Sequence, residues 1–450
     1  MTHNLRITDS TTTIYLSEDD LYLGEYAPAV SLDNAPLRER LQVGFTRNIN
    51  AIRGKVQAIN RLFQQATNYQ RTRTGNRVYV EFDPGNTGTY YRSELYNGRI
   101  EMTRETLGGE WGAANLELDM EWTRQPFWEG ALTQLRLSNT SSTDNLTGIT
   151  VNNRDDASGE NWATIWGQDV EGDLPAPVKI QMLNATTDAN ATDEIYIFHN
   201  VYSAPLLFDP LIEGEASTDA SATTDANSSA GAYGVLSWAA TTETKIAEWA
   251  LPSSDLDDAG GGRFAVLARW PAVFPYTNAS LRLKLETAST YNALWTGSLS
   301  LVAPTTDTQR ELNLLDTLRL PPYLQGQSSL KSIILSLYAL RATTDTHTIN
   351  LDYLYLAPIS GDAGWKRFVS VSNGVGIDET FIYDGTEGFI YKTDSAGDAI
   401  AEFTDYGGPI LLVPDVDQRL HFLTCDYLGA AEVAQSWTVK AWYRPRRSSI

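Results

Sequence analysis

The chain has 450 residues, a formal net charge of −22 and a pI near 4.6. Hydrophobic residues make up 42% of it, so cores can form and a wholly disordered chain is excluded. Binding to nucleic-acid phosphates needs Lys and Arg gathered on one face, and the one dense basic run is YRPRR at 443–447, which we interpret as a soluble end of the chain. A single cysteine, Cys425, excludes an internal disulfide framework and a cysteine-based zinc site.

The N-terminal sequence MTHNLRITDSTTTIYL lacks the basic segment and apolar run of a signal peptide. No stretch approaches the ~20 apolar residues that a membrane span needs. We therefore expect a protein that is made in a cytosol and does not insert into membranes. The length suits two to four domains, and 12 Trp and 22 Tyr against four Met favour β-structure.

One segment has helical periodicity. In residues 50–70, apolar side chains recur at spacings of four, three and four residues, at Ile52, Val56, Ile59 and Phe63. This is one face of an amphipathic helix, which we expect to cover one face of a sheet.

A run of strands follows the predicted helix. RVYVEF (77–82) and TYYRSELY (89–96) flank a turn-rich loop, and Asn97-Gly98 is a strong signal for a second turn. In LELDMEWTRQPFWEG (116–130), apolar and acidic residues alternate, which predicts a half-buried strand that ends before the proline.

From residue 131 onward the chain reads as short strands separated by polar turns. The acidic, Ser/Thr-rich stretch 213–232 is predicted to be a loop. About eight strand signals, 10–15 residues apart, lie between 206 and 358 and are typical of a β-sandwich or jelly roll. The strands after it are too few for an independent core, so 131–205 and 360–450 are predicted to form one discontinuous domain that hosts 206–358 as an insertion.

An insertion needs its entry and exit close together. Pro205 and Pro358 border the segment, which is consistent with linkers at both edges. We therefore expect the strands before Ser203 and after Gly364 to be spatial neighbours.

No catalytic constellation emerges from the motifs. The four histidines lie in unrelated segments without metal-ligand spacing, and there is neither a G-x-S-x-G elbow nor a phosphate-binding loop. They are His3, His199, His347 and His421. The Gly-rich stretch 253–262 contains three carboxylates that could bind Ca²⁺ (Asp255, Asp257 and Asp258), but it lacks the full ligand series of an EF-hand, so a β-loop is the preferred interpretation. We predict no catalytic, cofactor or metal residues.

Aromatic residues leave a second possibility open. Trp residues on a jelly roll could stack on sugar rings, or they could fill its core, and core packing is the default for Trp238, Trp249, Trp270 and Trp295. Carboxylates next to Trp, at 110–111, 121–122 and 248–249, are expected on opposite faces of strands, one in water and one in the core.

The N-terminal block resembles the distal tail proteins of long-tailed bacteriophages. The resemblance lies in the order of GEYAPAV, RNINAIRGKVQAINRLFQQATNY, RVYVEFDPGNTGTYYRSELYNGRIEM and LELDMEWTRQPFWEG, and the end GGPILLVPDVDQRLHFLT…SWTVKAWYRPR is similar to such a protein's closing strands. It implies a belt-type β-sandwich with one long helix and a β-hairpin (1–128), joined to a galectin-like β-sandwich. The middle segment is similar to the carbohydrate-binding jelly rolls sometimes inserted in these proteins.

The resemblance also implies a function. Belt domains form a hexameric ring that joins the tail tube protein to the tail-tip hub, in a virion tail made in the host cytoplasm. We expect a mainly β structural protein, not an enzyme, that holds no nucleic acid stably, with PFWEG as a hinge between domains. The alternatives are a carbohydrate-binding adhesin that recognises a host-surface glycan and, third, a polysaccharide-degrading enzyme with a carboxylate pair.

Overall fold

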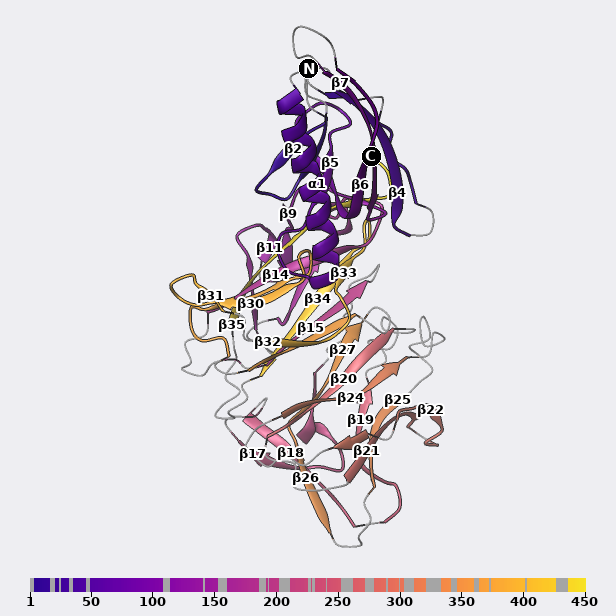
Figure 1. The fold of residues 1–450 in the computed structure, drawn as a ribbon. Coiled ribbons are helices and arrows are strands. Elements are labelled where there is room, and N and C mark those ends of the chain that lie inside the picture. The colour runs from indigo at the N-terminus through magenta and orange to yellow at the C-terminus, as the bar shows by residue number, and fades with distance from the viewer. Residues whose placement is uncertain are drawn as a thin grey trace. The chain divides into compact units, whose positions relative to one another are not determined.

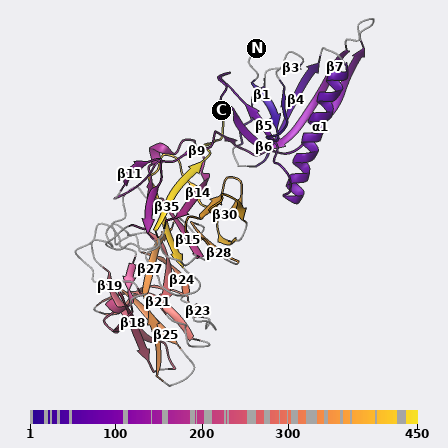
Figure 2. The same ribbon diagram turned by 90° about the vertical axis from the view of Figure 1, so that its left-hand side faces the viewer.

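The fold was determined as a computed structural model, in which the chain forms two compact units (Figures 1 and 2). Unit 1 comprises Met1–Thr133, Glu171–Ala176 and Arg444–Ile450, and unit 2 comprises Gln134–Val170 and Pro177–Tyr443. The structure describes residues 4–16, 21–23, 26–31, 35–45, 49–107, 114–140, 142–152, 160–185, 192, 194–201, 211–225, 228, 231–239, 241–251, 262–271, 279–288, 290–298, 300–302, 311–320, 333–340, 346–359, 364–371, 374–400, 403–425 and 436–450.

Unit 1 is a nine-stranded antiparallel sheet with one helix against it (Figure 1). The main path of the sheet runs through β2 (Thr13–Tyr15), β1 (Leu5–Thr8), β5 (Tyr79–Phe82), β6 (Tyr91–Leu107), β7 (Ala114–Arg124), β4 (Leu37–Phe45) and β3 (Leu21–Leu23). Two short strands, β8 (Trp128–Glu129) and β36 (Arg446–Arg447), pair with each other, and β8 also pairs with β6.

The predicted helix is α1, Ile49–Thr72. Ile52, Ile59 and Phe63 are buried in the core of unit 1, and Val56 packs half-buried against it, so the predicted apolar face is confirmed. In Figures 1 and 2, α1 lies alongside the long strands of the sheet. None of the described helices combines the length and apolar character that a membrane crossing requires.

The turn predicted at Asn97-Gly98 is wrong. Strand β6 runs through both residues, with a register shift against β7 between Leu95 and Asn97. A Cβ atom on Gly98 would lie 2.6 Å from Cγ of Phe63, so glycine is needed there because the helix approaches the strand closely. The Asn-Gly signal was a packing signal and not a turn signal.

The strand predicted in 116–130 is β7, with the alternation as expected. Leu118, Met120 and Trp122 are buried in the core. The stretch after it, PFWEG, is not a bare link between units. Trp128 is fully buried in unit 1, and Trp128–Glu129 form β8, because a strand from the far end of the chain pairs with it.

Unit 2 contains two larger sheets built from residues outside 206–358. The eight-stranded sheet comprises β12 (Ile149–Asn152), β35 (Ser436–Tyr443), β14 (Ala176–Asn184), β29 (Thr380–Asp384), β30 (Phe389–Thr393), β31 (Ala399–Ile400), β33 (Leu411–Leu412) and β9 (Thr133–Gln134). The seven-stranded sheet comprises β11 (Ser142–Asn145), β10 (Leu137–Asn139), β13 (Trp162–Ile165), β34 (Gln418–Cys425), β15 (Glu194–Val201), β28 (Trp365–Ser370) and β32 (Phe403–Gly407). Phe368 of one sheet packs on Phe381 of the other, with ring centres 4.9 Å apart.

Three smaller sheets contain the described strands between Leu211 and Ile359. One is four-stranded: β16 (Leu211–Glu213), β27 (Tyr353–Ile359), β20 (Arg263–Trp270) and β24 (Glu311–Arg319). The five-stranded sheet has β19 (Thr244–Leu251), β25 (Ile333–Leu340), β21 (Ala279–Thr287), β22 (Ala293–Thr296) and β23 (Ser300–Val302), and the three-stranded sheet has β17 (Ser221–Thr224), β18 (Ala232–Trp238) and β26 (His347–Leu351). They enclose one apolar core.

The described strands within 211–359 pair only with one another. On either side of them, β15 pairs antiparallel with β28, and Phe198 lies opposite Trp365. The expectation that the strands before Ser203 and after Gly364 are neighbours is therefore confirmed. The insertion of 206–358 as a separate domain stays a prediction.

Two further expectations differ from the structure. The stretch 213–232 is not one loop: it includes the short 3-10 helix Gly214–Ala216, strand β17 and the start of β18. Residues 444–450, which the sequence grouped with 360–450, belong to unit 1. Both segments form short polar strands through hydrogen bonds to neighbouring strands. Such strands lack the apolar alternation by which a strand is recognised in a sequence, so composition did not predict them.

Candidate functional site

The histidines, the first candidates for chemistry, are dispersed. His199, His347 and His421 are each about 3% exposed, on strands β15, β26 and β34, and His3 lies outside the described residues. His199 and His421 lie on neighbouring strands, but their side chains alternate to opposite faces, since His421 pairs with Phe198 in the ladder. Within the described ranges, no three His, Cys, Asp or Glu side chains gather as a metal site would require. Asp255, Asp257 and Asp258 lie outside the described residues.

The candidate sugar-stacking residues are core residues. Trp238, Trp249 and Trp270 are at most 4% exposed in the core that the smaller sheets enclose, and Trp295 packs partly buried against it. The default interpretation is confirmed for the first three. They present no ring face to a glycan.

The carboxylate–Trp pairs also behave as predicted where they are described. Trp122 and Trp249 are buried, whereas Glu121 and Glu248 point to the other face of their strands and form ion pairs there. The pair at 110–111 lies outside the described residues.

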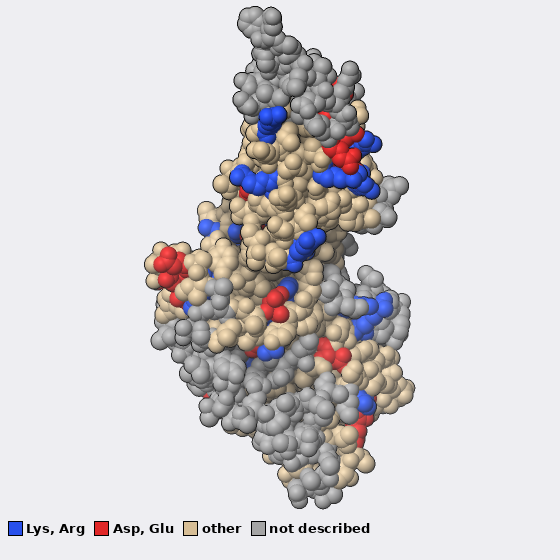
Figure 3. All heavy atoms as spheres, viewed as in Figure 1, with Lys and Arg blue, Asp and Glu red and all other residues tan. Residues whose placement is uncertain are grey.

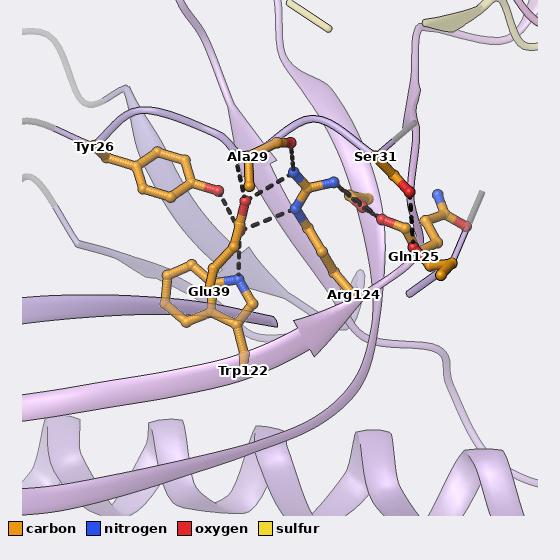
Figure 4. Close-up of polar contacts among 9 residues, drawn as sticks. Tyr26, Ala29, Ser31, Glu39, Trp122, Arg124 and Gln125 are labelled. Carbon is orange, nitrogen blue, oxygen red and sulfur yellow. Dashed lines mark hydrogen bonds and ion pairs between the residues drawn. The ribbon is translucent and has the colours of Figure 1, made fainter. Parts of the chain in front are cut away.

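A buried ion pair organises one end of the core of unit 1 (Figure 4). Arg124 on β7 has no exposed surface, and Glu39 on β4 is 7% exposed. The guanidinium donates from Nε to Oε2 of Glu39 at 3.0 Å and from Nη2 to Oε1 at 2.8 Å. This is a bidentate contact, the geometry that only arginine offers a carboxylate.

Three further donors complete the shell of the Glu39 carboxylate. The Tyr26 hydroxyl and Trp122 Nε1 donate to Oε2 at 2.8 and 2.9 Å, and the Ala29 amide donates to Oε1 at 2.8 Å. Tyr26 and Ala29 belong to GEYAPAV, the first block of the phage-tail resemblance. The network therefore fixes this segment onto β4 and β7 (Figure 4).

The electrostatics of this network are structural. Burial raises the pKa of Glu39, but the hydrogen bonds and charge of Arg124 outweigh burial, so the pKa lies below its ordinary value. Burial and then the Glu39 charge raise the pKa of Tyr26. The Glu39 carboxylate accepts five hydrogen bonds, which join β4, β7 and the segment of Tyr26 and Ala29. This arrangement stabilises the fold of unit 1.

A row of alternating charges crosses the sheet of unit 1 from strand to strand. Its members lie opposite one another in the successive ladders of β1, β5, β6, β8 and β36: Arg6, Glu81, Arg92, Glu129 and Arg446. Arg446 donates to Glu129 Oε1 from Nε and Nη2, at 3.1 and 2.9 Å, and Arg92 Nη2 lies 3.3 Å from Glu129 Oε2. We call this row the charge ladder.

Aromatic rings flank the charge ladder. The guanidinium carbon of Arg6 is 3.7 Å from the ring centre of Tyr90, and that of Arg92 is 4.3 Å from Tyr79. Arg446 lies 4.0 Å from the centre of Phe127, the aromatic of PFWEG. Such stacking keeps the long side chains in fixed rotamers and so reduces the entropic cost of the ion pairs.

Residues 444–450 are held in a slot between two other segments of unit 1. Gly130 donates its amide to the Pro445 carbonyl at 2.8 Å, and the Asp173 carboxylate accepts from the Ser448 amide and hydroxyl. Gly172, at φ +115°, leaves room for the Arg446 carbonyl, where a Cβ atom would collide. Ile450 packs against the core. Interpreting YRPRR as a soluble end is therefore wrong: Arg446 is the last member of the charge ladder, Arg444 donates to the Gly130 carbonyl, and Arg447 pairs with Glu171.

Sequence patterns missed both the ion pair and the slot. Their partners are far apart in the chain, and single charged residues within strands read as solvent-facing. The one available signal was Arg124, which falls in phase with Leu118, Met120 and Trp122 on the apolar face of its strand. An in-phase arginine implies a buried carboxylate elsewhere.

Comparison with known proteins gives no family. No family model matches the chain, and neither does any curated protein. Among solved structures, the chain is similar to the infectious bursal disease virus VP2 subviral particle, with 8% identity, 71% of this chain and 81% of that chain covered, and a TM-score of 0.19. For the infectious bursal disease virus Gt strain the values are 9%, 71%, 82% and 0.19. At such TM-scores the similarity establishes neither a family nor a function.

Proposed function

We propose that this chain is a structural virion protein of a bacteriophage tail. In this proposal unit 1 forms a hexameric ring that joins the tail tube protein to the tail-tip hub. The observation that supports it most directly is that the N-terminal segment with the resemblance and the compact unit 1 cover nearly the same residues. The N-terminal sequence blocks that resemble distal tail proteins correspond to the elements of unit 1, from the Tyr26 segment through α1, β5 and β6 to β7 and β8, whereas most of the C-terminal block lies in unit 2.

The internal organisation of unit 1 suits a ring component. A 24-residue helix packs on long antiparallel strands, and a saturated ion pair and a charge ladder tie its edges together. Such cross-links make a rigid block, and closed rings need subunits whose interfaces keep a fixed angle. Permanent interfaces of this kind bury ~2,000 Å² or more.

Native mass spectrometry of the full chain, with negative-stain electron microscopy, tests the proposal. We expect a closed particle of six copies at micromolar concentration. A matched pair of variants tests whether unit 1 builds it: Arg124→Ala should abolish the ring, whereas Tyr291→Ala, at a half-exposed ring of unit 2, should leave it intact. A monomer or a two-fold dimer at every concentration would contradict the proposal.

The proposal includes the absence of stable nucleic-acid binding. Unit 1 has a formal charge of −2 and unit 2 one of −20, so neither unit attracts phosphates by its net charge, and a conduit for DNA should not hold its cargo. Fluorescence anisotropy with a labelled duplex at physiological salt should show no saturable binding below ~10 μM, a weaker affinity than specific DNA-binding proteins reach. Submicromolar binding would refute this part.

A further inference from the structure

Strands of unit 2 that are buried on both faces mark a contact between its sheets. Strands β15, β20 and β27 have almost no exposed residue. One face of β20 and β27 belongs to the core enclosed by the smaller sheets. The other packs on the seven-stranded sheet and forms a separate apolar cluster. We call this contact the joint, and its apolar members are Tyr196, Phe198, Ala265, Leu267, Tyr353, Tyr355, Ala357, Ile359 and Leu423.

Aromatic side chains dominate the joint. The rings of Tyr196 and Phe198 stack at 5.9 Å between centres, and Phe198 lies 6.3 Å from Tyr355 across the contact. Asn161 donates from Nδ2 to the Tyr355 hydroxyl at 2.5 Å. All nine apolar members of the joint are at most 3% exposed, so apolar packing supplies much of the attraction.

Three polar side chains lie at the joint with unsatisfied atoms. Asn161, Asn200 and His421 are at most 3% exposed. Asn161 Oδ1, Asn200 Oδ1 and both ring nitrogens of His421 have no hydrogen-bond partner among the described residues. The ladder places His421 opposite Phe198 and also opposite Trp162. A buried polar atom without a partner destabilises the contact in which it lies, so these atoms weaken the joint.

His421 is the titratable group in this set. Burial, followed by the positive charge of Arg419 and by His199, lowers the pKa of His421 to about 3. The imidazole is therefore neutral in the joint at neutral pH. A proton on it would place a cation beside Arg419 on the same face of β34.

Among the residues that the structure describes, the carboxylates near His421 already have cationic partners. Glu194 lies on the same face of β15 but pairs with Arg367 and accepts from the Tyr196 hydroxyl at 2.9 Å. Asp352 pairs with Arg269. The strands packed at the joint carry the following other titratable and charged groups: Arg419 and Cys425 on β34; Glu194, Tyr196 and, on the opposite face, His199 on β15; Arg367 and, on the opposite face, Lys366 on β28; Arg263 and Arg269 on β20; and Tyr353 and Tyr355 on β27 with the adjoining Asp352. Strand β13 contributes none.

We propose that the joint is an acid-sensitive contact, in which protonation of His421 separates the seven-stranded sheet from the four-stranded sheet while the core enclosed by the smaller sheets stays folded. The separated state accepts the proton because water then solvates the imidazolium. Since one proton is taken up on opening, the opening constant should rise about tenfold for each pH unit below 6.5. The inference is independent of the tail-ring proposal.

The test measures the protection of buried thiols in the full chain. Two matched alanines, both fully buried, serve as reporters: Ala357 in the joint and Ala339 in the neighbouring core. Ala357→Cys and Ala339→Cys are made separately on a Cys425→Ser background. Their reaction with 4,4′-dithiodipyridine is measured from pH 7.0 to 4.5, relative to the unfolded chain at the same pH.

Protection of the Ala357→Cys thiol should fall about tenfold per pH unit below 6.5, whereas protection of the Ala339→Cys thiol should stay constant. His421→Phe should abolish the slope, and His421→Gln, also uncharged, should do the same if the first variant folds poorly. His347→Phe, at a buried histidine outside the joint, should retain the slope. Equal losses at both thiols, or an unchanged slope without His421, would overturn the proposal.

Discussion

The two units differ most in how they handle charge. Unit 1 has 17 Lys and Arg against 19 Asp and Glu, a formal charge of −2, so the remaining −20 of the total −22 belongs to unit 2. Sixteen of the 17 basic residues of unit 1 are arginines. In Figure 3, Lys and Arg appear at several separate places over unit 1, with an acidic cluster beside them.

This difference shows that a net charge for the whole chain describes only one part of it. In unit 1, arginines are structural: they pair with carboxylates in the charge ladder and in the Glu39–Arg124 network, and they stack on rings. In unit 2, the buried ionisable groups include His199 and His421, and burial lowers the pKa of both imidazoles. Repulsion of nucleic acid is strongest at unit 2, because its formal charge is −20.

The largest expected effect is at the buried ion pair. Arg124→Ala should lower the free energy of unfolding of unit 1 by about 3–5 kcal/mol, because it leaves a buried carboxylate without its cation. Urea unfolding of the full chain, followed by circular dichroism, measures it. The double variant Glu39→Leu with Arg124→Met should be less destabilised than Arg124→Ala alone. A loss below ~1 kcal/mol, as for an exposed pair, would contradict the structural role.

The second largest effect is expected at acid pH, where unit 2 should lose more stability than unit 1. Burial lowers the pKa of His199 to about 4 and, together with the charge of Arg419, that of His421 to about 3. Because both values are below the ordinary 6.5, the stability of unit 2 is fully present above pH 6.5 and falls as the pH drops. Each imidazole should cost about 1.4 kcal/mol per pH unit.

Unit 1 should respond to acid in a lower range. The pKa of Glu39 lies below its ordinary value, because Arg124 outweighs the effect of burial. Its contribution is therefore present above the ordinary pKa of glutamate and is lost only below it. Thermal unfolding between pH 7.0 and 5.0 should lower the transition of unit 2 and leave that of unit 1 in place. Equal shifts of the two transitions would contradict this difference.

A smaller effect is expected where the helix meets the sheet. Gly98→Ala should destabilise unit 1 by about 1–3 kcal/mol, since the added methyl group overlaps the Phe63 ring. Phe63→Leu in the same chain should recover part of the loss, and Gly54→Ala, on α1 with open space around it, is the matched control. Thermal denaturation measures all three. Full additivity of the two substitutions at the contact would show that they do not touch.

How much the sequence predicts depends on whether the signal is local. The helical face of Ile52, Ile59 and Phe63 and the alternation in β7 were readable, because burial imposes a period on neighbouring residues. The Asn97-Gly98 pair led to a wrong prediction. The glycine is needed because the Phe63 ring packs on it, but the same dipeptide is also the usual signal for a turn. The partners of Glu39 and Arg446 lie 85 and 317 residues away in the chain, so no local pattern reveals them.

The smallest expected effect is at the last member of the charge ladder. Arg446→Ala removes two hydrogen bonds to Glu129 and the stacking on Phe127, but Arg92 remains beside the carboxylate. We expect unit 1 to lose about 1 kcal/mol, since the Arg446 side chain is 19% exposed and partly screened. The matched control is Arg99→Ala, which also removes an arginine paired with a glutamate on a strand of this sheet, but whose side chain is 58% exposed. It should change the stability by less than ~0.5 kcal/mol. Urea unfolding measures the stability of unit 1 in both variants, and the transition of unit 2 serves as an internal reference in each sample. Equal effects would mean that the slot for residues 444–450 depends on its backbone hydrogen bonds and on Ile450 rather than on the charge ladder.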